Sequence, residues 1–157
     1  MKKHIRKHRR MSGITMVESL VALVVISVGM LGIAGMYLAS LQAGRSASLR
    51  MQAINLASDM ADHVRANARG RAFYKALATD KGEQKDCKTA TCSEEEIAKN
   101  DIYVWKHAIS EALPANANGQ LTFTAVAGRA PDLVAIKVVW REAGSDVDST
   151  YEAMVEL

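Results

Sequence analysis

One acidic residue near the N-terminus is unusual because it lies at the start of a long apolar segment. Glu18 directly precedes a run that carries no charged residue from Ser19 to Gly44. A carboxylate at the centre of a bilayer costs roughly 2.5–3.5 kcal/mol, and less near the interface. Glu18 is also the fifth residue of the segment that begins at Ile14, directly after Gly13. Either this acid reaches from the helix end to the membrane surface, or its charge has a partner and a role.

The residues before this segment are strongly basic. Residues 1–13 contain six Lys or Arg and no acid. The other 14 basic residues are outnumbered by 17 Asp and Glu, so the rest of the chain carries a net charge of about −3. The pI of 8.9 therefore reflects the leader. No basic stripe remains that would indicate a direct nucleic-acid partner.

The apolar run has the length of a membrane span. Residues 20–41 are 22 uncharged residues, and as a helix they would cover roughly 33 Å, enough for the hydrocarbon core of a bilayer. The basic flank predicts a cytoplasmic N-terminus, with the rest of the chain outside. A conventional secretory signal or a twin-arginine signal fits less well, because the run is too long and its end (SLQAGRS) offers no clear A-x-A-like site.

The chain has two cysteines, Cys87 and Cys92. Outside the membrane this pair favours a disulfide, which would stabilise the fold by about 2 kcal/mol for so short a loop. A metal site would need two further ligands, and no nearby His is placed to help. No Ser/His/Asp, Cys/His or paired-acid arrangement stands out. The sequence therefore predicts no cofactor and no enzyme.

The helical periodicity continues after the apolar run. Apolar residues recur at intervals of three and four, with polar residues on the other faces; they are Leu49, Ala53, Leu56, Ala57, Met60 and Val64. We expect one helix from about Ile14 to Asn67, with residues 14–44 in the membrane or a filament core and 45–67 as an amphipathic continuation. Gly70 is a candidate for the residue that ends it. His63, on this helix, and His107 have no convergent partners, and we expect them to be surface or structural residues.

Residues 68–157 should form a globular head. Residues 72–93 are expected to be a polar connector, with a turn at Asp80-Lys81-Gly82. Ser93 and Glu96 form a capping-box pattern that opens a helix to about Leu113. The apolar side of this helix is predicted to be Ile97, Ile102, Trp105, Ile109 and Leu113.

The end of the chain is rich in β-branched and aromatic residues. Pro114 should end the preceding helix and Asn118-Gly119 should turn into the strands. Strands are expected at 121–126, 133–141 and 150–156, as an antiparallel meander whose apolar face covers the outer half of the long helix. Asp146 and Asp148 indicate a solvated turn rather than a calcium loop, because no EF-hand pattern surrounds them. The predicted fold class is α+β, a long N-terminal helix packed against a small antiparallel sheet.

The string from Gly13 to Leu23, GITMVESLVAL, closely resembles the class III prepilin motif of type IV pilins. The resemblance implies a type IV pilin fold, with residues 1–13 as the leader. Prepilin peptidase would cut between Gly13 and Ile14 and methylate the new amine of Ile14. Ile14 departs from the Phe that is usual there.

The resemblance also gives Glu18 a role. Cleavage would leave a cation at Ile14, and Glu18 of one subunit would neutralise the terminal amine of its neighbour, which sets the axial register of the filament. Gly29, Gly32 and Gly35 recur every three residues. They are either ordinary membrane-helix glycines, which allow close helix packing, or a segment that loosens when the subunit leaves the bilayer. Many major pilins have a proline at the position aligned with Gly35.

Further strings resemble the PilV type of minor pilin, namely residues 18–32, 55–62 and 136–140. That implies a minor subunit of the pilus tip that works with other minor pilins, the major pilin, the inner membrane and its assembly platform, with a tip adhesin as a further candidate partner. The subunit would be single-pass in the inner membrane with a periplasmic head, then on the cell surface for adhesion or twitching motility. Two alternatives stay open: an I-type pseudopilin of type II secretion, and a single-span membrane protein with a periplasmic binding domain.

Overall fold

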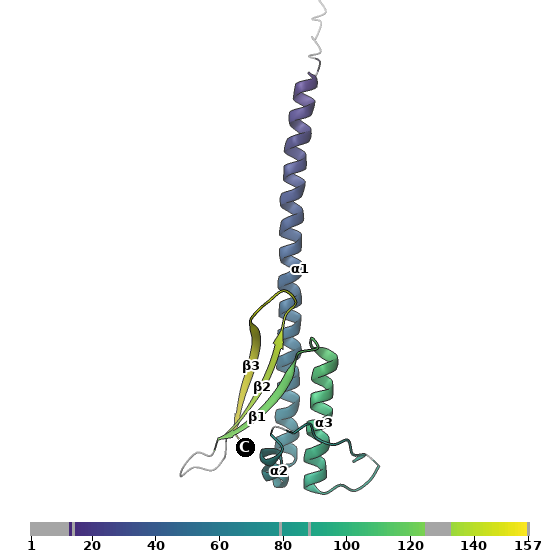
Figure 1. Cartoon of the computed structure of the whole chain (residues 1–157), viewed down its shortest axis with the longest axis vertical. Helices are drawn as coiled ribbons and strands as arrows, with labels where there is room; N and C mark the ends of the chain where they lie inside the picture. Colours follow the sequence, from purple (N-terminus) through teal and green to yellow (C-terminus); the bar gives the residue numbers. More distant parts are fainter. Residues whose placement is uncertain (1–12, 14, 79, 88, 125–132, 157) are drawn as a thin grey trace, which may run out of the picture. The chain divides into compact units, whose positions relative to one another are not determined.

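A computed structural model describes residues 13, 15–78, 80–87, 89–124 and 133–156. The elements follow one another as α1 (Met16–Ala66), η1 (Ala68–Gly70), α2 (Arg71–Ala76), α3 (Glu94–Ala112), β1 (Asn118–Thr124), β2 (Leu133–Arg141) and β3 (Asp148–Glu156) (Figure 1). The chain divides into two compact units, Met1–Ala43 and Gly44–Leu157. The second unit contains the predicted head, residues 68–157, together with the second part of α1.

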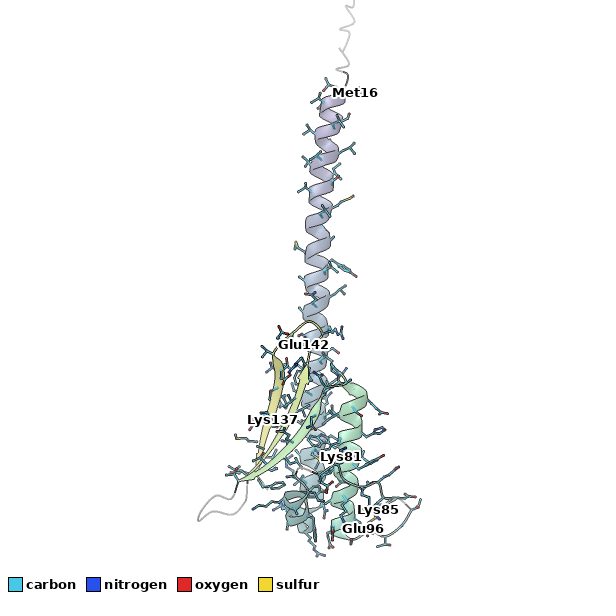
Figure 2. The ribbon with its side chains drawn as sticks, in the orientation of Figure 1. Met16, Lys81, Lys85, Glu96, Lys137 and Glu142 are labelled. Atoms are coloured by element: carbon cyan, nitrogen blue, oxygen red, sulfur yellow. A yellow bond between two sulfur atoms is a disulfide. The ribbon has the colours of Figure 1, made fainter. Side chains whose placement is uncertain are left out.

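The described part of the N-terminal unit consists almost entirely of the apolar part of α1. Within the described residues, α1 is the helix that is long and apolar enough to cross a membrane. Every residue from 15 to 43 is exposed, and their side chains line this part of the helix in Figure 2. The Ser27 hydroxyl donates to the Leu23 carbonyl at 2.7 Å, so this polar group is satisfied within the helix.

The second part of α1 contributes one face to the core of the head. Ala53, Ala57, Met60 and Val64 are fully buried, which confirms the predicted stripe. Leu49 and Leu56 pack at its margin. Trp105 of α3 ties the two helices together, because its indole nitrogen donates to the Leu56 carbonyl at 2.8 Å.

The three strands form the predicted antiparallel meander. They lie in the order β1-β2-β3 (Figure 1), with Leu121 opposite Ile136 and Val138 opposite Tyr151. Alternate residues of the central strand β2 face the core, and four of them are buried: Val134, Ile136, Val138 and Trp140. The long helix and the sheet share one hydrophobic core, so the predicted α+β fold class is confirmed. Residues 125 and 126 of the first predicted strand lie outside the described residues.

The end of the long helix differs from the prediction. α1 ends at Ala66, and Asn67 caps a short 3-10 turn by accepting from the Gly70 amide at 3.2 Å. Gly70 has φ −85°, so it is not the left-handed glycine that was expected to end the helix. A further helix, α2, then occupies the start of the predicted connector and buries Tyr74. Its six residues are too few for a periodic pattern to reveal.

The connection from α3 to β1 also differs in detail. The capping box of Ser93 and Glu96 is present, and α3 ends at Ala112 as expected. The turn, however, is closed by the Ala117 amide and the Pro114 carbonyl at 2.8 Å, and Asn118 and Gly119 already belong to β1. Gly119 is there for close packing, since a Cβ atom on it would lie 2.6 Å from both Ile109 Cδ1 and Trp105 Cζ3.

Candidate functional site

The start of α1 is capped by a residue that the motif analysis gave no role. Thr15 precedes the helix, and its hydroxyl accepts from the Glu18 amide at 3.3 Å. The Thr15 carbonyl accepts from the Ser19 amide at 3.2 Å. These are the bonds of an N-cap. The spacing Thr-x-x-Glu is the sequence signal that reveals it.

The cap places Glu18 in the first turn of the helix. A carboxylate there lies beside the unpaired amides of the helix N-terminus, where the helix dipole favours negative charge by about 0.3–1 kcal/mol at an exposed site. Glu18 and Gly13 are both exposed. Ile14, the predicted site of cleavage and methylation, lies outside the described residues.

The three glycines of the apolar segment meet nothing within their own unit. A Cβ atom placed on Gly29, Gly32 or Gly35 has no neighbour within 4 Å. The large apolar side chains around them are exposed, with Leu31 at 73% and Met36 at 76%. These glycines therefore leave room on the surface of α1 without serving any close contact inside the chain.

Cys87 and Cys92 form a disulfide, with Cα atoms 5.5 Å apart. The segment that leads to it is held against α3 by its backbone. The Glu83 amide donates to the Lys99 carbonyl at 3.1 Å, and the Lys85 amide donates to Asn100 Oδ1 at 3.0 Å. At Gly82 the chain has φ 72°, and a side chain there would collide with the Tyr103 backbone. The predicted turn thus requires glycine.

The prediction that His63 lacks partners is wrong. Its Nδ1 lies 3.3 Å from Asp101 Oδ1, and its Nε2 lies 3.8 Å from Asp59 Oδ2. The hydrogen bond with Asp101 raises the pKa of His63 above its usual value. His107 also has a carboxylate neighbour, Glu111, at 3.4 Å, and lies on the surface as expected.

Asp101 is the buried polar centre of this cluster, with 7% of its surface exposed. Besides His63, it accepts a hydrogen bond from the hydroxyl of Tyr74. Burial, and next the hydrogen bond with Asp101, raise the pKa of Tyr74 well above its usual value. The cluster joins α1, α2 and α3, so it positions the helices of the head. It lies inside the fold and lines none of the cavities described below.

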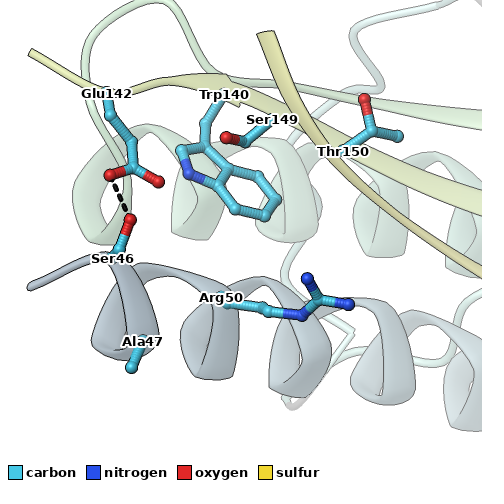
Figure 3. A pocket seen from close by; sticks show the side chains of 7 residues that line it. All are labelled: Ser46, Ala47, Arg50, Trp140, Glu142, Ser149 and Thr150. Carbon is cyan, nitrogen blue, oxygen red and sulfur yellow. Dashed lines mark hydrogen bonds between the residues drawn. The ribbon is translucent and has the colours of Figure 1, made fainter. Parts of the chain in front are cut away.

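A cavity of about 380 Å³ lies between α1 and the β2–β3 hairpin (Figure 3). Its lining includes Arg50, Trp140 and Glu142, and the Ser46 hydroxyl donates to the Glu142 carboxylate. The indole nitrogen of Trp140 is buried and has no hydrogen-bond partner among the described atoms. Asp148 pairs with Arg141 at 2.7 Å across the hairpin. The described residues contain no cluster of three or more His, Cys, Asp or Glu that would hold a metal.

A helix that Thr15 caps, and whose apolar part is long enough to span a bilayer, continues into a small α+β head. By length and composition, this combination is consistent with a subunit that its N-terminal helix anchors in a membrane. Two family models match adjoining parts of the chain: the prokaryotic N-terminal methylation motif at residues 8–34, and type IV pilin Tt1218 at residues 35–103. The chain belongs to the type IV pilin family. No curated protein and no solved structure matches it.

Family membership fixes the class of activity. Pilins are structural proteins, so the chain is a filament subunit and not an enzyme. The prepilin motif implies processing by prepilin peptidase and assembly with other pilins. The apolar half of α1 is the membrane anchor of such a subunit.

Proposed function

We propose that the chain is a minor, PilV-type pilin that joins other minor pilins at the pilus tip and starts the filament used for adhesion and twitching motility. The observation that carries the filament role is Glu18, a single exposed carboxylate in the first turn of a membrane helix whose following residues, Ser19 to Gly44, are uncharged. The minor, PilV-type assignment rests on the resemblance of residues 18–32, 55–62 and 136–140. A helix that served only as an anchor has no need for this charge, which is unfavourable in a bilayer.

Cleavage between Gly13 and Ile14 supplies the matching charge. The new terminal amine of Ile14 is a cation in the same low-dielectric region, where an isolated charge is unfavourable and a pair is favourable. Glu18 of one subunit then neutralises the amine of its neighbour. Since the rest of the segment is uncharged, this pair sets the axial register of the bundle, as one buried polar residue does in a coiled coil.

The proposed division of the chain follows from this mechanism. Residues 1–13 are the leader, 14–44 the membrane and filament-core helix, 45–67 its amphipathic continuation, and 68–157 the head. The division into compact units after Ala43 supports the second boundary. The basic leader supports a cytoplasmic N-terminus, with the head in the periplasm before assembly and on the cell surface afterwards.

Mass spectrometry of the mature N-terminus tests the processing step. We expect the chain isolated from membranes or sheared pili to begin at Ile14 and to carry a methyl group. The same chain from cells without prepilin peptidase should keep residues 1–13. A mature chain that starts at Met1 or Lys2 contradicts the proposal.

The role of Glu18 is tested by substitution. Glu18→Ala should be inserted and cleaved normally but be absent from sheared filaments. Ser19→Ala, at the next position, is the matched control and should enter filaments. Normal incorporation of Glu18→Ala would rule out the register role and leave the cleavage site unaffected.

Deletion of the gene distinguishes the subtype. If the chain is a minor pilin, its loss should reduce the number of surface pili and abolish twitching, and its re-expression should restore both. If piliation stays normal while secreted enzymes accumulate in the periplasm, the chain is a pseudopilin of type II secretion. If neither changes, the proposed role in starting the filament is wrong.

A further inference from the structure

We propose that the head carries a binding site for an acidic carbohydrate, in a cavity between α3, the loop before it and the start of β1. The cavity has a volume of about 560 Å³, within the range of roughly 300–1,000 Å³ that is usual for small-ligand sites. It is lined by Lys81, Tyr103, Lys106, His107, Ser110 and Asn118.

The lining is basic although the mature chain is acidic overall. No carboxylate lines the cavity, and Lys81 and Lys106 form no ion pair with any residue that the structure describes. Lys106 is half-buried, and its ammonium donates to the Asp80 carbonyl, a neutral acceptor. Burial lowers the pKa of Lys106, and the nearby Asp80 carboxylate opposes this shift only in part. A partly desolvated ammonium of this kind is stabilised by an anion, because water no longer fully solvates its charge.

The position of Lys81 is fixed by its backbone. The Asp80 carboxylate accepts from the Lys81 amide at 2.6 Å, and the left-handed Gly82 follows directly. The side chain of Lys81 is exposed at the rim of the cavity. Lys81 and the half-buried Lys106 both line the cavity, and, besides burial, the charge of Lys81 contributes to lowering the pKa of Lys106. Two such cations suit a single carboxylate or sulfate group.

The remaining lining suits a sugar ring. Tyr103 and His107 stack with their ring centroids 6.1 Å apart and an angle of 22° between the planes. The ring of Tyr103, which is half-buried in this lining, can pack against the C–H face of a pyranose. The Ser110 hydroxyl donates to the His107 carbonyl at 2.7 Å, which leaves its oxygen free to accept a hydrogen bond from a sugar hydroxyl. Asn118 adds an amide that both donates and accepts.

The surroundings favour a sugar acid over a nucleic acid. Phosphate backbones are bound by extended basic tracks, whereas this cluster ends at the cavity. Glu111 lies 3.4 Å from His107 on the outer side of α3, and the Asp80 carboxylate is next to Lys81. A continuous polyphosphate would meet these acids. A saccharide with isolated charges and neutral hydroxyls would not be repelled in the same way.

The experiment uses the full chain in detergent micelles. Calorimetry or thermophoresis measures its binding to hyaluronate and chondroitin sulfate oligosaccharides, to neutral maltooligosaccharides, and to single-stranded DNA of similar length. Lys81→Gln and Lys106→Gln each remove one cation of the cavity. Lys137→Gln is the matched control, because Lys137 lies on the sheet and outside the cavity (Figure 2). Circular dichroism checks that each variant is folded. If Lys106→Gln fails to fold, the exposed Lys81→Gln still gives a result.

We expect at least one acidic oligosaccharide to bind and neutral sugars to bind much more weakly. Because a hydrogen bond to a charged group contributes about 1.5–3 kcal/mol, each cavity variant should weaken binding roughly tenfold or more, and Lys137→Gln should leave it unchanged. The proposal is overturned if neutral sugars bind equally well, if Lys137→Gln loses as much as Lys81→Gln, if DNA binds more tightly than both acidic sugars, or if none binds at millimolar concentration. These outcomes concern the purified chain and do not depend on its place in a filament.

Discussion

Asp101 is the residue on which the helices of the head depend most directly. It is buried, and its two partners, His63 and Tyr74, come from α1 and α2. A buried carboxylate is tolerated only when it is paired and hydrogen-bonded. The cluster therefore links the filament helix to the head by directional bonds as well as by apolar packing.

The first prediction concerns the hydroxyl of Tyr74. Tyr74→Phe should lower the free energy of unfolding of the head by about 1–3 kcal/mol, because the buried Asp101 then lacks one of its donors. Urea denaturation of the full chain in detergent, followed by tryptophan fluorescence, measures this change. Tyr151→Phe is the control, since Tyr151 is half-buried and its hydroxyl has no hydrogen bond within the described residues. Equal losses in both variants would mean that the hydrogen bond with Asp101 does not contribute measurably to the free energy of unfolding.

The second prediction concerns pH. The carboxylates around His63 are Asp101 of α3 and Asp59 and Asp62 of α1, and together they raise its pKa above 6.5. A raised pKa means that the stabilising interaction is fully present below pH 6.5 and is lost as the pH rises through the pKa of the folded state. Since more than a third of the His63 side chain is exposed, solvent screening keeps the effect below about 1 kcal/mol.

Denaturation series from about pH 6 to pH 9 should show this decline in stability. His63→Gln should flatten it, and His107→Gln, which changes an exposed histidine on α3, should leave it in place. A curve that is equally steep in His63→Gln would assign the decline to another group.

At the scale of elements, close packing of α3 on the sheet depends on one glycine. Gly119→Ala should cost about 1–3 kcal/mol, because the added methyl group overlaps Trp105 and Ile109 and the core must shift. Gln120→Ala, the exposed neighbour on the same strand, should change stability by less than about 0.5 kcal/mol. Thermal unfolding of the two variants compares them, and a Gly119→Ala chain as stable as the control would show that the ring of Trp105 adapts freely.

The disulfide stabilises the loop before α3. Replacing both cysteines with serine should lower the free energy of unfolding by about 2 kcal/mol, as the chain-entropy estimate for so short a loop gives. Limited proteolysis should then cut first between residues 80 and 93. Reduction of the unmodified chain by dithiothreitol should reproduce both effects, and a reduced chain that stays as resistant as the oxidised one would contradict the prediction.

Elements with strong local signals were predictable from the sequence. Residues close together in the sequence reveal these elements. The buried stripe of α1 and the three strands follow from regular spacing of apolar residues, and the start of α3 follows from its capping box. The contact of His63 with Asp101 was not predictable, because Asp101 approaches it from a separate helix. Asp59, by contrast, lies four residues earlier on α1, at a spacing that is visible in the sequence. α2 was missed because it is short. Gly119 was assigned to a turn because Asn-Gly usually forms one, but it lies in β1, where the close approach of Trp105 leaves no room for a side chain.

The same distinction applies to the N-terminal site. The spacing of Gly13, Ile14 and Glu18 was visible in the sequence as a resemblance to the prepilin motif. The cap formed by Thr15 appears in the geometry, although its Thr-x-x-Glu pattern was readable beforehand. The cap places the Glu18 carboxylate at the N-terminus of α1, where the helix dipole favours negative charge. This interaction lies within the chain and adds to any pairing with the amine of a neighbouring subunit.

At the scale of the whole molecule, the two compact units place different demands on the sequence. The head buries its apolar residues within the chain. The apolar segment of α1 has large exposed side chains throughout, so its partners are lipids before assembly and other pilins afterwards. Substitutions in this segment should therefore affect assembly while leaving the stability of the head unchanged.

The glycines of the segment give the clearest test of this separation. Gly32→Leu should leave membrane insertion, cleavage and the unfolding of the head unchanged, because a Cβ atom at this position has no neighbour within 4 Å apart from the adjacent residues and backbone of its own helix. In a filament the bulky residue would hold neighbouring helices apart, since small residues are what allow close approach. We expect the amount of the chain in sheared pili to fall at least severalfold.

Ala34→Leu adds similar bulk on the opposite side of the helix, at 100° per residue, and should be tolerated better. If both variants assemble normally, the glycines are not packing positions. If both fail equally, bulk anywhere on the segment blocks assembly, and the glycine strip has no particular role.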